Sequence, residues 1–312
     1  MTYSGIGGQA VMEGVMMRNK EKYAVAVRRQ DGEIELMEGV YKGIVSSETV
    51  YKIPFVRGIF SFIDSLVLGL KTLNFSSDIY MEESGKEEEK SEAPKGPKKK
   101  SAKDTAVTTV IMIVAVLVAM GLFMILPYFA SQLFKNLTDN QHILALLEGV
   151  IRLAVFVLYI KAISSMEDIR RVFMYHGAEH KCINCIEGGK PLTVDNVRSS
   201  SKEHRRCGTS FLLYVMVISI LFFALIESPN HALRVVLRIV LIPVIAGVSY
   251  ELIRLAGRSD NVFIRALSAP GLWMQRLTTS EPDDTMIEVG IRSVEAVFDW
   301  KSYLKENFGE KT

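Results

Sequence analysis

The chain has 312 residues, a net charge of +2 and 49% apolar residues. This apolar fraction is high for a wholly soluble protein and moderate for a protein with several membrane spans, so the composition favours membrane and aqueous parts together. The small net charge, without a basic stripe interleaved with aromatic residues, argues against a nucleic-acid partner.

Residues 1–80 are predicted to form a small N-terminal β-containing domain followed by an interfacial helix. Alternating residues in 23–29 and 33–39, separated by an Asp31-Gly32 turn, predict a β-hairpin. The glycine-rich opening lacks the G-x-G-x-x-G spacing, so it favours a turn or a close backbone approach over nucleotide binding. No secretory signal peptide is recognisable at the start. The three cysteines are therefore expected to be reduced and to face the cytoplasm.

The helix predicted over 54–75 carries Arg57, Asp64 and Lys71 seven residues apart, on one face. An aspartate at the bilayer centre costs about 2.5–3.5 kcal/mol. We therefore expect this helix to lie in the membrane interface or to pack against the bundle. If it spanned the membrane instead, the orientation of every later segment would invert. Residues 81–104 form a charged linker without aromatic residues and are predicted to be disordered.

Residues 105–257 are predicted to form a membrane domain of about four spans. Each of four apolar runs approaches the roughly 20 residues that a span needs, and they cover residues 105–134, 142–166, 208–226 and 232–256. Lysine and arginine gather before the first run, in the loop 167–207 and after the fourth run. The positive-inside rule therefore places both termini and this loop in the cytoplasm. The predicted fold class is a mainly α, polytopic transmembrane helical bundle with a small N-terminal β-containing cytoplasmic domain.

Several ionisable residues interrupt the apolar runs. Such residues usually face a bundle interior or a water path, so Glu148 is expected to pair with Arg152, and Glu251 with Arg254. Glu251 is also a weaker candidate for an additional metal ligand. The remaining arginines near the outer end are expected to snorkel to the surface, and they are Arg234 and Arg238.

Residues 258–312 are predicted to form C-terminal interfacial and amphipathic helices. Trp273 suits an interface anchor. Apolar residues repeat every three to four positions over 283–308, which predicts one amphipathic helix.

The loop 167–207 contains the strongest chemical motif. His176 and His180 are four residues apart, so on a helix both imidazoles reach one cation. With Glu179 they form the string H-x-x-E-H, the inverted zincin pattern, in which two histidines bind zinc and the glutamate activates water. The sequence therefore predicts a site for a divalent metal ion, with zinc favoured, and makes Glu179 the candidate catalytic residue.

His204 and Cys207 supply two further candidate ligands, three residues apart. If the spans that flank the loop pack side by side, both ends of the loop meet at one membrane surface. Four protein ligands would indicate a closed structural zinc site, and three ligands plus water a catalytic one. One alternative remains, in which the loop binds no metal and its polar residues contact lipid headgroups or a partner. Cys182 and Cys185 fit half of a zinc knuckle, a redox pair or two small apolar residues.

Four motifs in chain order resemble those of the YqhQ-like membrane proteins, domain of unknown function 1385, and they are "GGQAVMEGVMMR" (7–18), "YHGAEHKCIN" (175–184), "RCGTSF" (206–211) and "APGLWMQRLTTSEPDD" (269–284). The resemblance implies a bacterial, multi-pass cell-membrane protein that is a predicted metal-dependent enzyme without an assigned reaction. Similar proteins often carry other residues at Cys182 and Cys185, which argues against these two as ligands. The family's motif letters are matched at Glu13, Arg18, His176, Glu179, His180, His204 and Cys207.

The function expected from the sequence is a metal-dependent membrane hydrolase acting at the cytoplasmic face, with the lipid bilayer and other membrane proteins as partners. Glu13 and Arg18 are expected to reach the site from the N-terminal domain. One alternative is a non-enzymatic assembly or chaperone factor for membrane proteins, with a structural metal. The other is a transporter that uses Glu148 and Glu251 in its path.

Overall fold

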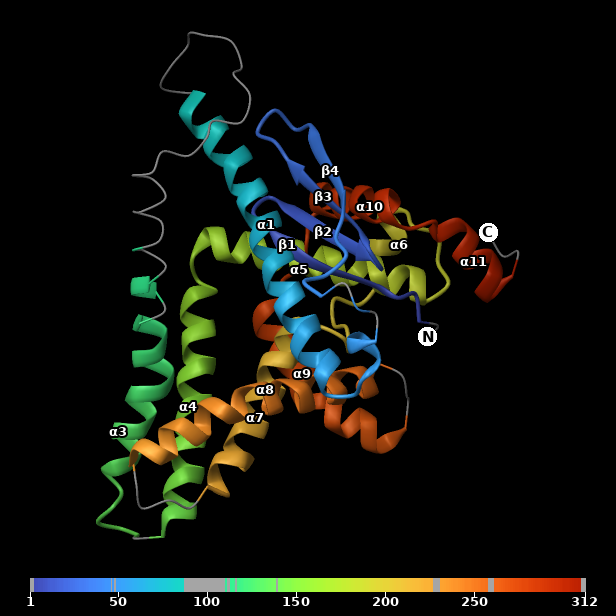
Figure 1. The fold of residues 1–312 in the computed structure, drawn as a ribbon. Coiled ribbons are helices and arrows are strands. Elements are labelled where there is room, and N and C mark those ends of the chain that lie inside the picture. The colour runs from blue at the N-terminus through green and yellow to red at the C-terminus, as the bar shows by residue number, and fades with distance from the viewer. Residues whose placement is uncertain are drawn as a thin grey trace.

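The computed structural model of the protein describes residues 3–45, 47, 49–86, 110, 113–115, 117–138, 140–226, 231–257 and 261–309. These residues form a small antiparallel sheet, the helices that cover it and a set of long apolar helices that extend away from it (Figure 1). Most of the predicted linker, residues 87–104, lies outside the described residues, and its first six residues, 81–86, are helical.

The sheet is a four-stranded meander in chain order, formed by β1 (Ile6–Val11), β2 (Gly14–Asn19), β3 (Lys22–Arg28) and β4 (Ile34–Val40). The predicted hairpin is confirmed as β3 and β4, and Gly32 in its turn has a φ of 89°. The glycine-rich opening forms the edge strand β1. The sequence did not indicate this strand, because glycine is depleted in strands and supplies no apolar alternation.

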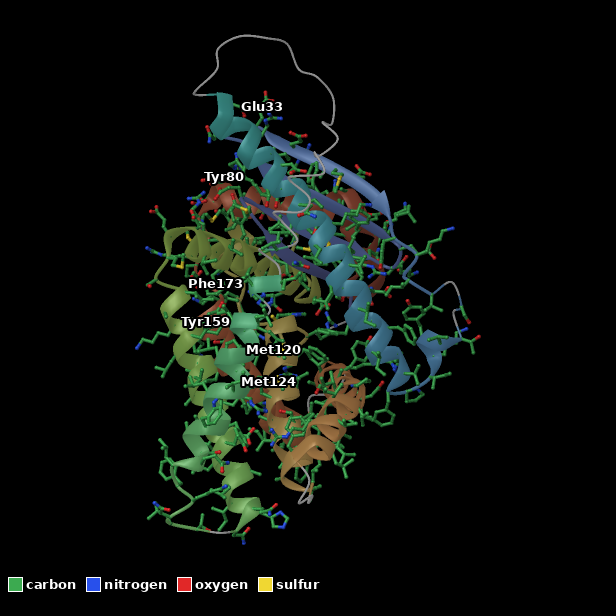
Figure 2. The ribbon with its side chains drawn as sticks, turned by 60° about the vertical axis from the view of Figure 1, so that its left-hand side comes forward. Glu33, Tyr80, Met120, Met124, Tyr159 and Phe173 are labelled. Atoms are coloured by element: carbon green, nitrogen blue, oxygen red, sulfur yellow. The ribbon has the colours of Figure 1, made fainter. Side chains whose placement is uncertain are left out.

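Both faces of the two central strands are buried, which explains why β2 and β3 carry apolar residues on both sides. One face contributes alternate residues to a core shared with α5 (Glu167–Glu187) and α10 (Asp284–Val297), and these residues are Ile6, Val15, Met17, Ala24 and Ala26. The other face packs against Leu68 and Ile79 of α1 (Val56–Lys86). In Figure 2, α1 runs across the sheet on the side facing the viewer. The sheet therefore lies between helices of widely separated parts of the chain.

Helix α1 is longer than the helix predicted over 54–75. It packs against the sheet and against α8 (His231–Ala256). Of the two arrangements expected for this helix, packing against the bundle therefore agrees with the structure. Buried Asp64 accepts hydrogen bonds from the Tyr51 hydroxyl (2.6 Å), the Tyr41 hydroxyl (3.1 Å) and the Ile44 N–H (2.8 Å). The short helix η1 (Val50–Lys52) carries Tyr51 to this position.

Among the described residues, three helices are long and apolar enough to cross a membrane: Ile113–Gln132, α4 (Gln141–Ile163) and Val236–Ala256 within α8. The first contains η2 (Gly121–Ile125) and α3 (Leu126–Gln132). The third predicted span corresponds to α7 (Gly208–Ala224), which is apolar but only 17 residues long. Helix α7 packs against α4, α8 and α9 (Val262–Thr278).

One pairing and one snorkelling arginine expected in the apolar runs differ in the structure, while the side chain of Arg234 lies outside the described residues. Glu148 pairs with Arg152 as predicted, at 2.6 Å. Arg238 does not snorkel but also contacts Glu148, at 3.1 Å. The main partner of Glu251 is Arg57 of α1, whose Nε lies 2.7 Å from the carboxylate, rather than Arg254. Spacing along one helix did not reveal these partners, because both arginines come from other helices.

The C-terminal region contains two helices where one was predicted over 283–308. Helix α10 ends at Val297, and Asp299 caps α11 (Trp300–Phe308) by accepting a hydrogen bond from the Ser302 N–H at 3.1 Å. Trp273 is half exposed on α9, and its role as an interface anchor stays a prediction. The short helix α6 (Val194–Arg198) follows α5 and packs against α10.

Candidate metal centre

Helix α5 brings His176, Glu179 and His180 together within little more than one turn. Its apolar face, which includes Tyr175, lies in the core shared with the sheet and α10. Glu167 and Asp168 occupy its first turn, where negative charge stabilises a helix. Because 3.6 residues complete a turn, the two histidines share a side of the helix directed toward α7 and α9. The predicted helical spacing of the motif is therefore realised.

Cys207 completes a cluster of three ligand atoms. It is the N-cap residue of α7, and its Sγ lies 3.2 Å from the Nε2 of His176. Ligand atoms of His176, His180 and Cys207 all lie within 4.8 Å of one another. Nitrogen and sulfur atoms around a tetrahedral zinc lie about 3.5 Å apart. The three residues can therefore bind one ion after small movements of their side chains.

Hydrogen bonds fix which nitrogen of each imidazole is available. The Nδ1 of His176 lies 2.9 Å from the carbonyl oxygen of Thr278, and the Nδ1 of His180 lies 2.6 Å from that of Lys202. A carbonyl oxygen only accepts, so both Nδ1 atoms carry a proton and donate. Neutral rings held this way present Nε2 as the free base. Metal-binding histidines are commonly oriented by such contacts to backbone carbonyls.

The electrostatics of the cluster favour a thiolate. Burial raises the pKa of Cys207, but His176 and His180 outweigh it and hold the pKa well below the ordinary value of a thiol. The Thr209 N–H, at the start of α7, donates to Sγ at 3.4 Å. Burial lowers the pKa of His176, yet the adjacent Cys207 raises it to about 9. A thiolate and two imidazoles are a ligand set that suits zinc.

Glu179 lies beside the cluster and is almost fully buried. Its carboxylate is 3.9 Å from the Nε2 of His176. Burial raises its pKa, although the two histidines and the backbone N–H of Gly8 act in the opposite direction. Gly8 approaches very closely, since a Cβ there would lie 2.7 Å from Glu179 Cγ. The glycine-rich strand thus makes the close backbone approach that the sequence suggested.

The structure does not bring His204 into the three-residue cluster. Its ring lies 5.7 Å from that of His180, centroid to centroid, and its Nε2 is 3.7 Å from the Glu187 carboxylate. Glu187 also accepts hydrogen bonds from the N–H and hydroxyl of Ser4 and contacts Arg206. The backbone of His204 is held by Gln275 of α9. His204 therefore belongs to a neighbouring ion-pair network.

The other predicted site residues lie farther away. Glu13, in the turn between β1 and β2 with a φ of 49°, pairs with Arg171 of α5 and accepts a hydrogen bond from Tyr175. Arg18 donates to the Lys20 carbonyl at 2.8 Å, and its guanidinium lies over a tyrosine ring. Glu13 thus docks the sheet onto α5 without reaching the cluster.

Cys182 and Cys185 are buried in the core between α5, the sheet and α10. Cys182 packs against Gly290, and the Cys185 thiol donates to the carbonyls of Lys190 and Pro191. Neither contributes to the three-residue cluster. Of the three interpretations that the spacing left open, small apolar residues fit this placement.

Several residues that shape the centre were missed from the sequence. The carbonyls of Thr278 and Lys202 orient the two imidazoles, and Gln275 fixes the segment before Cys207. Backbone carbonyls leave no trace in residue identity. The sequence offered one signal, the Gly-Gly pair at 7–8. It indicated that the backbone approaches another group closely, but it did not identify that group as Glu179.

Comparison with known proteins places these observations in a family. The family described as "Protein of unknown function (DUF1385)" matches residues 53–300. The uncharacterized protein YqhQ of Bacillus subtilis (strain 168) is 36% identical over 304 residues, which cover 96% of this chain and 94% of that relative. No solved structure matches the chain.

Proposed function

The chain belongs to the DUF1385 family, whose description assigns no function, and we propose from the geometry that it is a metal-dependent membrane hydrolase. In this proposal His176, His180 and Cys207 hold a divalent cation, with zinc preferred. Glu179 is the general base. The reaction takes place at the cytoplasmic face of a bacterial cell membrane.

One observation carries the proposal: Glu179 is a buried carboxylate without a guanidinium or ammonium partner among the described residues. The other buried carboxylates have such a partner or several hydroxyl and N–H donors, as Glu148, Glu187 and Asp64 illustrate. Isolated buried charge is strongly unfavourable. The nearest groups that can carry positive charge are the imidazoles of His176 and His180. When both rings are neutral metal ligands, the cation held between them and the thiolate would offset the charge of Glu179, and this supports the proposal.

The residues present suit general-base chemistry at such an ion. A bound divalent ion supplies Lewis acidity and lowers the pKa of its water to about 7. Glu179 lies next to the ligand atom of His176 and can accept a proton there. The raised pKa of its carboxyl brings it closer to neutral pH, where a base is most effective. The carbonyl-anchored rings keep both Nε2 atoms in place.

A structural metal in a non-enzymatic assembly factor is the second candidate. It is favoured by the depth of the cluster, since His180 is 1% and Cys207 5% exposed. The cluster also joins α5, the start of α7 and the carbonyl that ends α9. No observation favours the transporter, because Glu148 and Glu251 are each held by arginines.

The first test measures metal in the purified full chain. We expect about one zinc per chain, lost in His180→Ala and Cys207→Ala because each removes a ligand. Cys185→Ala is the matched control, since it removes a buried thiol of the same helix region without touching the cluster. Wild-type protein without stoichiometric metal would contradict both metal proposals.

The second test separates catalysis from structure without a known substrate. In cobalt-substituted protein an open coordination position lets added azide change the visible spectrum, whereas four protein ligands leave it unchanged. We expect Glu179→Gln to keep its cobalt and to shift the pH dependence of the spectrum. A spectrum insensitive to azide, pH and Glu179→Gln would favour the structural metal.

A further inference from the structure

A second cluster of buried charge lies in the apolar helices, far from the candidate metal centre. Arg152 of α4 and Arg238 of α8 both contact Glu148, at 2.6 and 3.1 Å. Both guanidinium groups also lie over the ring of Phe223 of α7, at 5.8 and 5.0 Å from its centroid. Three helices thus converge on one charged group.

The charges of this cluster do not cancel. Two arginines give +2 and Glu148 gives −1, so the net charge is +1. Glu148 and Arg152 are 5% and 9% exposed. The Nε atoms of Arg152 and Arg238 are buried and have no hydrogen-bond partner among the described residues. A cluster with one uncompensated charge and two unsatisfied N–H groups is costly in an apolar environment, and an anion would satisfy both.

The arginine side chains of the cluster are directed toward the end of the helices opposite the metal centre. Phe223 is next to the last residue of α7, about 24 Å along that helix from Cys207. The Nδ1 of His142, at the start of α4, bonds to the carbonyl of Ala224 at 2.8 Å, so the start of α4 lies beside the end of α7. Side chains on a helix lean toward its N-terminus. Arg152 and Arg238 therefore lean toward the surface opposite the metal centre.

We propose that Arg152 and Arg238, braced by Glu148 and Phe223, form a binding site for a phosphate-type anion between α4 and α8. The source is the phosphodiester of an anionic phospholipid or free phosphate. Guanidinium groups present planar forks that match phosphate oxygens. Basic pockets between membrane helices bind anionic headgroups by this chemistry. Glu148 holds the two forks in place and leaves one positive charge for the ligand.

The test titrates phosphatidylglycerol into the full chain in detergent and reads bound lipid by native mass spectrometry. Phosphatidylcholine serves as the neutral-headgroup comparison, and inorganic phosphate as the competitor. We expect phosphatidylglycerol to bind in preference to phosphatidylcholine. Arg152→Gln and Arg238→Gln should each weaken its binding about tenfold or more, the effect of losing a charge-assisted hydrogen bond. Lys161→Gln is the control, because it removes a positive charge from the exposed end of the same helix.

Glu148→Gln gives the sharpest result because it raises the net charge of the cluster to +2. If the cluster is an anion site, this variant should bind phosphatidylglycerol more tightly than wild type. If the cluster is only a structural ion pair, the affinity for phosphatidylglycerol should fall or stay the same. If inorganic phosphate displaces the lipid, the phosphate group alone is sufficient for binding. If inorganic phosphate does not compete, the site is specific for the phospholipid. Equal binding of both lipids, unchanged binding in both arginine variants, or unchanged or weaker binding in Glu148→Gln overturns the proposal. Elution profiles of each variant check that it is folded.

Discussion

At the scale of single residues, the candidate metal centre depends on contacts that determine protonation. Backbone carbonyls hold the proton of each imidazole on Nδ1, and the position of Cys207 at the start of α7 stabilises its thiolate. Glu179 is held against strand β1, where no side chain intervenes. These contacts direct Sγ and both Nε2 atoms into the cluster, where a bound divalent ion would take the place of the Nε2 protons.

Gly8→Ala tests the close approach of β1 to Glu179. The added Cβ would lie 2.7 Å from both Glu179 Cγ and the Met16 carbonyl oxygen, so either the strand or the carboxylate must move. We expect a loss of about 1–3 kcal/mol in stability, as for other overpacked sites, together with weaker cobalt retention. Gly7→Ala is the matched control, because nothing lies within 4 Å of its Cβ. Equal melting temperatures for the two variants would show that the contact is unimportant.

Glu187 predicts a pH-dependent contribution to stability. Burial raises its pKa, but His204, Arg206 and Ser4 together lower it from 4.5 to about 2. Because the pKa is lower in the folded state, ionised Glu187 stabilises the folded state fully above about pH 4.5. This stabilisation is lost as the pH falls toward 2. We expect the free energy of unfolding of wild type to exceed that of Glu187→Gln by on the order of 3 kcal/mol at pH 7. The difference in melting temperature should narrow below pH 4.5, and a difference that is constant from pH 7 to 3 would contradict this account.

At the scale of elements, α1 joins the sheet to the apolar helices. Its buried face contacts β-strand residues through Leu68 and Ile79, and Arg57 at its start binds Glu251 of α8. Asp64, between these two regions, fixes Tyr41, Ile44 and Tyr51 against the helix through two tyrosine hydroxyls and one N–H. The aspartate that seemed too costly for a bilayer centre is thus satisfied within the protein.

Asp64→Ala should release the segment that connects β4 to α1. The substitution removes the acceptor of three hydrogen bonds, and each typically contributes about 1 kcal/mol or more. Hydrogen exchange measured on peptides covering residues 41–53 should become faster, while exchange in α5 stays unchanged. Ser65→Ala, which alters an exposed neighbour bonded only to the Ser61 carbonyl among the described residues, is the control. Unchanged exchange in 41–53 would show that other contacts hold this segment.

Elements were predictable where a local signal was strong, either a turn between alternating residues or a long apolar run. Strands β3 and β4 follow an alternating pattern around Asp31-Gly32, and α4 and α8 are long and apolar. Strand β1 was missed because glycines interrupt it. Strand β2 was missed because it lacks apolar alternation and no Asp-Gly turn marks its connection to β3. The break at Phe298–Asp299 was missed because the apolar periodicity of α10 continues past it, while the cap of α11 depends on two hydrogen bonds from Ser302 to Asp299.

At the scale of the whole molecule, segments far apart in sequence share one core. The sheet packs on α5 and α10, although α5 begins 127 positions after the end of β4 and α10 follows later still. Removing either helix would expose an apolar face of the sheet. The candidate metal centre lies at the junction of this core with the apolar helices, where α5, α7 and the end of α9 meet.

The membrane topology predicted from charge can be tested with introduced cysteines. Lys135→Cys lies in the short connection after α3, and Ser201→Cys lies in the loop that contains the metal motif; both positions are exposed. With this loop in the cytoplasm, a membrane-impermeant maleimide should label Lys135→Cys in intact cells and Ser201→Cys only after permeabilisation. Unsubstituted protein, whose three cysteines are buried, is the control. The opposite labelling pattern would invert the topology.

The sequence by itself determined the chemistry available and its local spacing. Residues His176, Glu179 and His180 share one side of a helix because of helical periodicity, and the apolar runs follow from composition. Only the tertiary structure decided which distant groups join them. It selected Cys207 and turned His204 toward Glu187, and it gave Glu148 a second arginine. The physical reason is that periodicity constrains neighbours on one element, whereas contacts between elements depend on how their buried faces pack.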